Sequence, residues 1–268
     1  MQSVLRAQQL SRQGFAHGFS TRQGGVSAAP YASLNLGGSV GDDAAKVAEN
    51  LRRFAGWVGY EPSRLFTLSQ VHGARVRTLS AGDEPEAVRG EQADALVARE
   101  RAPIAIRTAD CVPLLLADPV TRCVAAVHAG WRGTVAGVVP AGVAALLAAC
   151  HAPPERLLAA VFPHIRACCF EVGADVAAQL NAVAHGADAI RPGPKPHVDL
   201  AAIVRAQLMA AGLVAQNVED VPGCTVCDPE RFYSFRRDAA ASGRHLAAIV
   251  AGGREPRSFA ELVPRPPL

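Results

Sequence analysis

Apolar positions recur at helical spacing early in the chain. In residues 44–57, Val47 and Phe54 belong to a stripe of apolar side chains three or four positions apart. Asp42 and Asp43 precede this stripe, and aspartate is a favoured residue at helix N-termini. The pattern predicts a helix over this segment with one face packed on a core.

Two further segments predict helices. The stretch D-L-A-A-I-V-R-A-Q-L-M-A-A-G begins at the capping residue Asp199 and stops at Gly212. The longest apolar stretch, residues 135–150, is shorter than the roughly 20 residues that span a bilayer, and it contains glycine and proline. We predict a buried helix there and no membrane span.

Strand-like apolar runs alternate with these helices. They occupy residues 64–79, 93–99, 103–118, 157–162 and 245–250. The first run is interrupted at His72 and Gly73, and the polar or proline-rich segments 81–92 and 190–197 predict loops. The mixture predicts an α+β fold, a layered sandwich of helices on a largely antiparallel or mixed sheet, in a single domain over residues 1–268.

Composition narrows the possible partners. The formal net charge is +3 with 19% charged residues and no basic block, so we expect neither nucleic-acid nor membrane binding. A small molecule is the expected partner, and a monomer is favoured. Seven cysteines without disulfide-scaffold spacing, and an N-terminus without an apolar signal core, predict a reducing, cytoplasmic setting.

The clearest chemical pattern lies in T-A-D-C-V-P-L-L-L-A-D-P-V-T-R-C-V-A-A-V-H. It predicts two strands, Cys111 to Ala117 and Arg122 to His128, joined by the turn D-P-V-T. If Ala117 pairs with Arg122, Cys111 faces His128. Directly opposed Cβ atoms lie about 4.5 to 5.5 Å apart, close enough for a thiolate and an imidazole to share one metal ion.

A third ligand is needed, and His72 at the strand break is the candidate. Three nitrogen and sulfur ligands with one open position describe a catalytic zinc, and these ligand types favour zinc or copper over magnesium or calcium. Spacing alone leaves an equal alternative, in which Cys111 is a small buried apolar residue and His128 a core histidine with satisfied hydrogen bonds.

The other cysteines give weaker signals. C-T-V-C, Cys224 to Cys227, has neither a second pair nor a histidine at zinc-finger spacing, so a cysteine lining the active site or simple packing is favoured over a structural zinc. Cys168 and Cys169 are adjacent and would point to opposite faces of a strand, so we predict that they are core residues and not joint ligands.

Four motifs together resemble the YfiH/YlmD-like family, first described as multicopper polyphenol oxidase or laccase. They are S-Q-V-H-G (69–73), T-A-D-C-V-P-L-L-L-A-D (108–118), V-A-A-V-H-A-G-W-R-G-T (124–134) and F-Y-S-F-R-R-D-A-A-A-S-G-R (232–244). Together with T-R-Q-G-G-V-S from residue 21, they make the resemblance cover almost the whole chain.

The resemblance implies a single zinc ion on His72, Cys111 and His128, in a cleft at a sheet end of a fold like the catalytic domain of cytotoxic necrotising factors. It also implies phosphorolysis of adenosine, inosine and S-methyl-5′-thioadenosine, deamination of adenosine to inosine, and in some bacteria peptidoglycan editing. Where the family often has glycine-proline before an isoleucine, this chain has Phe162-Pro163-His164-Ile165. We expect this difference to reshape the loop beside the cleft.

These reactions require groups that hold phosphate, move protons and bind a base. Arginine forks and helix N-termini suit phosphate, a carboxylate can shuttle a proton, and a flat aromatic ring can stack on a purine. The candidate catalytic residues are Asp110, Arg132 and Arg22, and the candidate substrate-binding residues are Trp131, Arg236, Arg244 and Cys227. Asp110 could instead cap a loop, Trp131 could fill space behind the hairpin, and Arg236 could pair with Asp238 on the surface.

Three other function classes compete with a zinc nucleoside enzyme. A copper oxidase is disfavoured because eight histidines without any H-x-H pair are a poor basis for several coppers. An amidase-like hydrolase that edits peptidoglycan precursors would use the same metal. A non-catalytic zinc protein would require a closed, four-ligand site.

Overall fold

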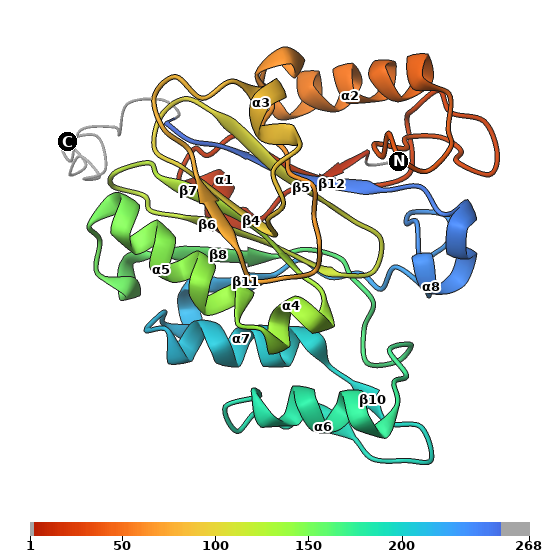
Figure 1. The fold of residues 1–268 in the computed structure, drawn as a ribbon, viewed down its shortest axis with the longest axis vertical. Helices are drawn as coiled ribbons and strands as arrows, with labels where there is room; N and C mark the ends of the chain where they lie inside the picture. Colours follow the sequence, from red (N-terminus) through yellow and green to blue (C-terminus); the bar gives the residue numbers. More distant parts are fainter. Residues whose placement is uncertain (1–2, 253–268) are drawn as a thin grey trace, which may run out of the picture.

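Two β-sheets lie face to face in the computed structural model, which describes residues 3–252 (Figure 1). In the smaller sheet every neighbouring pair is antiparallel. Its strands, in spatial order, are β1 (Val4–Leu5), β2 (His17–Ser20), β12 (His245–Val250) and β5 (Pro103–Thr108). The sheet therefore joins both ends of the described chain to its middle.

The larger sheet is mixed. Its edge pairs β11·β8 and β3·β4 are parallel, and its three inner pairs are antiparallel. Its strands, in spatial order, are β11 (Val218–Asp220), β8 (Leu158–Val161), β6 (Val112–Ala117), β7 (Val124–Ala129), β4 (Ala95–Ala98) and β3 (Val76–Thr78). A separate two-stranded ribbon consists of β9 (Ile190–Arg191) and β10 (His197–Val198).

Helices cover the outer face of each sheet. The larger sheet carries α4 (Trp131–Val135), α5 (Val138–Cys150) and α7 (Leu200–Ala210), with α6 (Ala174–Ala182) beyond them, and the smaller sheet carries α2 (Ala44–Val58) (Figure 1). The short helices are α1 (Gln8–Arg12), α3 (Pro85–Arg89) and α8 (Phe235–Asp238). Four 3₁₀ turns span Pro62–Arg64, Pro154–Arg156, Ala215–Asn217 and Ala239–Ala241.

Alternation along the central strands produces three apolar layers. On β6, Leu114 and Leu116 face α5 and α7, whereas Leu115 and Ala117 face the smaller sheet. A third layer lies between the smaller sheet and α2, where Phe54 is fully buried. Because β6 is buried on both faces, its sequence is a continuous apolar run, and each large side chain contributes about 1.5 to 3 kcal/mol through burial. The predicted layered α+β sandwich is confirmed.

The predicted helices are also confirmed. Asp43 caps α2 by accepting hydrogen bonds from two backbone N–H groups, and Asp199 caps α7 in the same way through one. The apolar stretch after residue 135 forms the buried helix α5. Among the described residues, no helix is both long enough and apolar enough to cross a membrane.

The predicted structure of three segments needs correction. The segment 81–92 contains the short helix α3 as well as loops, because Pro85 is well suited to a first helical turn. The segment 190–197 begins with the two-residue strand β9 and runs into the two-residue strand β10, with a loop between them. In the run 64–79 only β3 is a regular strand; isolated bridges form at Phe66 and Ser69, and the chain bends at residues 72–73, where His72 has a φ of 60°.

The hairpin of β6 and β7 forms with a different register. Pro113, not Cys111, lies opposite His128, and Ala117 pairs with Val124. The turn is longer than predicted because Asp118 accepts hydrogen bonds from Val120, Thr121 and Arg156, which hold a wider loop. A shift of two residues preserves the faces of a strand, so Cys111 and His128 still lie on the same side as diagonal neighbours.

Candidate metal centre

Three side chains from separate segments meet at one end of the larger sheet. His72 lies in the loop before β3, Cys111 directly precedes β6, and His128 lies near the end of β7. One donor atom of each residue lies within 4.8 Å of the others, and the two imidazole centroids are 4.9 Å apart. The predicted trio therefore comes together, and we call it the His-Cys-His centre.

A buried carboxylate supports this centre. Asp94, just before β4, is fully buried, and its Oδ1 accepts hydrogen bonds from His128 Nδ1 at 2.8 Å and from the His72 backbone N–H at 2.9 Å. Its Oδ2 accepts from Gly73 N–H at 2.7 Å. The contact to Nδ1 directs the other ring nitrogen of His128 toward Cys111, an arrangement typical of metal-binding histidines.

Gly130 leaves room for the ligands. A Cβ at this position would lie 3.0 Å from Cys111 Sγ and 3.0 Å from His72 Cδ2, closer than side chains normally approach. The absence of a side chain at residue 130 therefore lets the loop of His72 close over the end of β7.

The charges of the centre stabilise one another. Burial raises the pKa of Cys111, but the His128 charge and hydrogen bonds from both histidines lower it to about 6. Burial lowers the pKa of His128, but the Cys111 thiolate and Asp94 raise it to about 9. Burial also raises the pKa of Asp94, and its hydrogen bonds to His128 and Gly73 lower it below its usual range. Without metal, the centre holds a thiolate beside an imidazolium.

This donor set fits a zinc ion. Two imidazoles, one thiolate and a carboxylate that orients one imidazole match the ligand chemistry of zinc, and three protein ligands leave a fourth position for a reactant. His72, Cys111 and His128 all line a pocket of about 470 Å³. A larger hollow of about 780 Å³ beside β3 and β4 is lined by neither histidine nor cysteine, so the smaller pocket is the candidate site.

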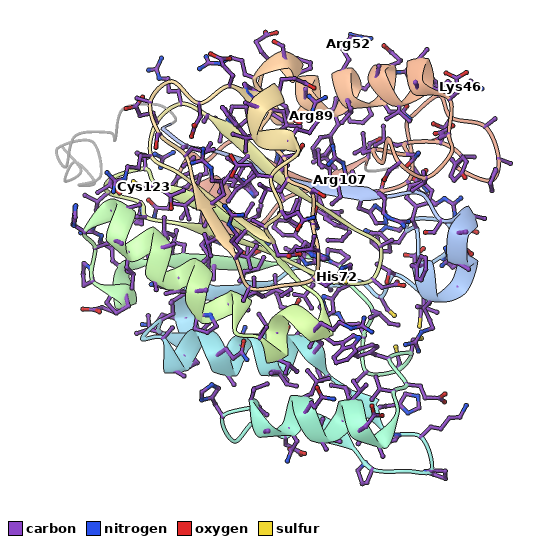
Figure 2. All side chains as sticks on the ribbon, viewed as in Figure 1. Lys46, Arg52, His72, Arg89, Arg107 and Cys123 are labelled. Atoms are coloured by element: carbon purple, nitrogen blue, oxygen red, sulfur yellow. The ribbon has the colours of Figure 1, made fainter. Side chains whose placement is uncertain are left out.

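The pocket wall combines arginines with aromatic rings. Arg107, Arg236 and Arg244 line it together with Phe170 and Phe235. Arg107 lies on β5 and is labelled in Figure 2. Arg236 and Arg244 were predicted from the sequence, whereas Arg107 and both phenylalanines were not. Nothing distinguished these residues until β5, the loop before α6 and the helix α8 were placed around the metal centre.

Asp110 lines the pocket but its carboxylate is engaged. Oδ1 accepts a hydrogen bond from Thr225 Oγ1 at 2.6 Å, and Oδ2 accepts from the backbone N–H of Arg236 at 2.6 Å. Its backbone has a φ of 91°, unusual for a residue with a side chain. Asp110 therefore ties the strand end that carries Cys111 to the loop of residues 224–227 and to α8.

The other candidate residues lie outside the pocket lining. Arg22 donates hydrogen bonds to the carbonyls of Ala32 and Pro229. Arg132 is exposed and stacks on Trp131, which packs against the apolar layer under α5. Cys227 belongs to a separate group of cysteines.

The departure at residues 162–165 affects the core more than the pocket. Phe162 and His164 are fully buried, Phe162 stacks on Phe19 at 5.9 Å, and only Ile165 of this segment lines the pocket. Burial lowers the pKa of His164 to about 4, so it is neutral near pH 7. Neither Phe162 nor His164 is placed to contact a ligand in the pocket.

Asp94 is the supporting residue that the sequence analysis missed. Its one sequence signal is an acid directly before a fully apolar strand, in E-Q-A-D-A-L-V. Such an acid can also cap a loop on the surface, so only its burial beneath two histidines reveals its role.

Comparison with known proteins identifies the family of this chain. Residues 16–252 match the family described as multi-copper polyphenol oxidoreductase laccase. A relative from Streptomyces coelicolor, named purine nucleoside phosphorylase SCO2081, is 44% identical over 87% of this chain and 93% of its own length. A purine nucleoside phosphorylase from Deinococcus radiodurans is 42% identical over 94% of both chains.

Solved structures share the fold. YlmD from Geobacillus stearothermophilus superposes with a TM-score of 0.86 at 33% identity, covering 95% of this chain and 97% of that one. The Neisseria meningitidis protein NMB0706 gives a TM-score of 0.75 at 36% identity, over 89% of this chain and 95% of the other. The chain thus belongs to the laccase-like YfiH/YlmD family, as its motifs predicted.

Proposed function

We propose that this protein is a zinc-dependent purine nucleoside phosphorylase that cleaves adenosine, inosine and S-methyl-5′-thioadenosine. The observation that carries the proposal is an incomplete, three-ligand metal centre opening into a pocket lined by three arginines. The names of the similar proteins from Streptomyces coelicolor and Deinococcus radiodurans support the same activity.

His72, Cys111 and His128 would hold the zinc ion, with Asp94 fixing the orientation of His128. When bound, the ion supplies a Lewis acid at the pocket floor. A multicopper oxidase is a poorer fit, because the two candidate metal-binding groups in the described part of the chain contain only two histidines.

The arginines suit inorganic phosphate. Within the described residues, the Arg107 guanidinium makes one hydrogen bond, from Nε to the Leu36 carbonyl, so its two terminal nitrogens can bind an anion. Arg244 is half-buried and uses Nη1 for backbone carbonyls, which holds its side chain at the pocket. Guanidinium forks match phosphate oxygens in geometry and in charge.

The aromatic rings suit the base. Phe170 is buried and Phe235 is 53% exposed, so Phe235 offers a ring face at the pocket mouth on which a purine can stack. We assign Asp110 a positioning role, since its two oxygens hold Thr225 and the start of α8.

In phosphorolysis a phosphate oxygen forms a bond to the anomeric carbon of the ribose while the bond from that carbon to the base nitrogen breaks. The base leaves with the bonding electron pair and takes up a proton, and the 1-phosphate of the sugar remains, which is ribose 1-phosphate for adenosine and inosine. Arginines that bind the dianion beside the sugar place the nucleophile for this displacement. Deamination of adenosine to inosine would use the same pocket with water as the nucleophile.

The test measures products from adenosine with and without phosphate. We expect phosphate-dependent release of adenine, with inosine as the product of deamination. Cys111→Ala should reduce both to background, and Arg107→Gln should raise the phosphate KM by about 10- to 100-fold through loss of a charge-assisted contact. Cys123→Ala, which removes a thiol remote from the pocket (Figure 2), is the matched control.

Three results would contradict the proposal. One is the absence of nucleoside turnover by the metal-loaded protein, and another is full turnover by Cys111→Ala. Release of amino acids from peptidoglycan precursors without nucleoside turnover would favour the amidase-like activity.

A further inference from the structure

Four cysteines that the proposed function does not use come together beside the pocket. Cys168 and Cys169 lie in the turn after β8, and Cys224 and Cys227 lie in the loop after β11. Their sulfurs all lie within 4.8 Å of one another. We call this group the four-cysteine cluster.

The prediction that Cys168 and Cys169 are core residues is wrong. Residues 167–169 form a turn and not a strand, so the two adjacent side chains can point the same way. Cys168 is exposed and Cys169 half-buried. The prediction assumed extended backbone, which would have separated their sulfurs.

The sulfur spacings match a shared metal ion. Cys168 Sγ lies 3.7 Å from Cys224 Sγ and 3.5 Å from Cys227 Sγ, and Cys169 Sγ lies 3.3 Å from Cys227 Sγ. Zinc binds thiolates at about 2.3 Å, so two sulfurs of a tetrahedral site are roughly 3.8 Å apart. A disulfide would bring two sulfurs to about 2 Å, and all four cysteines are free.

The two cysteine segments are held in position by contacts of their own. The Arg166 guanidinium forms a two-pronged ion pair with Asp220 at 2.6 and 2.7 Å and donates to the Gly223 carbonyl at 3.1 Å. Arg166 lies two residues before Cys168, and Gly223 directly precedes Cys224. This clamp places the sulfurs before any metal arrives.

The contacts among the four sulfurs are weak without a metal. Thiols offer one another only weak S–H donors. A shared metal ion would instead bind each cysteine as a thiolate.

We propose that Cys168, Cys169, Cys224 and Cys227 form a second, structural zinc site closed by four thiolates. Four protein ligands leave no position for a reactant, so this ion holds structure and does not react. A set of four thiolate ligands favours zinc among the common divalent ions of proteins.

The site supports the wall of the pocket. Arg236 Nη1 donates to the carbonyls of Cys169 and Glu171 at 3.3 and 3.0 Å, and Phe170 directly follows Cys169. Arg237 Nη1 donates to the carbonyl of Thr225 at 2.8 Å. The zinc ion therefore fixes the loop that carries Phe170 and the helix that carries Arg236, both of which line the pocket.

The test counts zinc per chain in protein purified under reducing conditions. Wild type and Cys123→Ala should each hold two zinc ions, and Cys224→Ser/Cys227→Ser should hold one. Cys111→Ala should also hold one, and combining it with the double substitution should leave none. These counts need no enzyme activity, so they stand or fall separately from the proposed function.

A second measurement covers the case in which the double variant fails to fold. Wild-type protein loaded with Co²⁺ should show sulfur-to-cobalt charge-transfer absorption from five thiolates. The Cys111→Ala variant should lose only the smaller part of this absorption. One zinc per wild-type chain, lost entirely in Cys111→Ala, would overturn the proposal. A disulfide within the cluster in the mass of the intact, unreduced protein would overturn it too.

Discussion

The His-Cys-His centre and the four-cysteine cluster gather metal-binding side chains in different ways. In the first, Cys111 and His128 lie at strand ends and His72 lies on a loop, and a buried carboxylate holds His128 and that loop. The second lies on two loops that are joined by an arginine clamp. Sheet hydrogen bonds can keep strand ends in place without metal, whereas loops depend more on the bonds that cross-link them.

The number of ligands separates the two groups further. Three ligands beside a pocket leave space for a reactant, and four thiolates away from the pocket lining leave none. This contrast underlies the catalytic role proposed for the first group and the supporting role proposed for the second.

The largest expected effect concerns stability. Cys227→Ser should lower the free energy of unfolding more than Cys111→Ala, by roughly 2 kcal/mol, because the binding energy of a structural metal is folding energy. Urea unfolding of the two variants measures this difference. Equal losses of unfolding free energy in the two variants would show that the cysteine loops do not depend on metal. The two metal groups would then not differ in their contribution to stability.

Asp94→Asn should weaken metal binding at the His-Cys-His centre by about 10- to 100-fold, the usual cost of losing a carboxylate behind a histidine ligand. Competition with a chromophoric chelator gives the affinity. Zinc at the four-cysteine cluster should be unaffected. Unchanged affinity at the centre would mean that Asp94 only closes the loop of residues 71–73.

Gly130→Ala should weaken the same centre by a few-fold, because the new methyl group would push Cys111 and His72 apart. Gly56→Ala is the control, since a Cβ at that helical position meets nothing within 4 Å and should stabilise the protein by about 0.5 to 1 kcal/mol. Metal affinity is measured for both variants. Wild-type affinity in Gly130→Ala would show that the loop can move aside.

The smallest effect is a proton count. In the metal-free protein the pKa of His128 is raised to about 9 and that of Cys111 is lowered to about 6. Between these values His128 carries a proton and Cys111 does not, so each zinc bound at this centre should release about one proton, and a second below pH 6. The release is measured by calorimetry of zinc binding in buffers of different ionisation enthalpy. The Cys224→Ser/Cys227→Ser variant is used so that zinc binds at the His-Cys-His centre alone. No release at pH 7.5 would contradict the ion pair.

Local patterns in the sequence determined much of this protein. Capping aspartates and spaced apolar residues predicted α2 and α7, and uninterrupted apolar runs predicted the central hairpin. Cys111 and His128 could be paired because a hairpin has few possible registers, and a two-residue error keeps both side chains on one face. The family motifs then indicated His72 as the third ligand.

Only the tertiary structure decided the rest, because the contacts involved are distant in sequence. Asp94 serves a histidine 34 positions away, and Cys168 meets Cys224 across 56 positions. Local propensity carries no information about such distances, and the turn at Cys168 and Cys169 broke the strand geometry on which the sequence argument relied. The packing of the two sheets and their loops thus decided which polar residues surround each metal group.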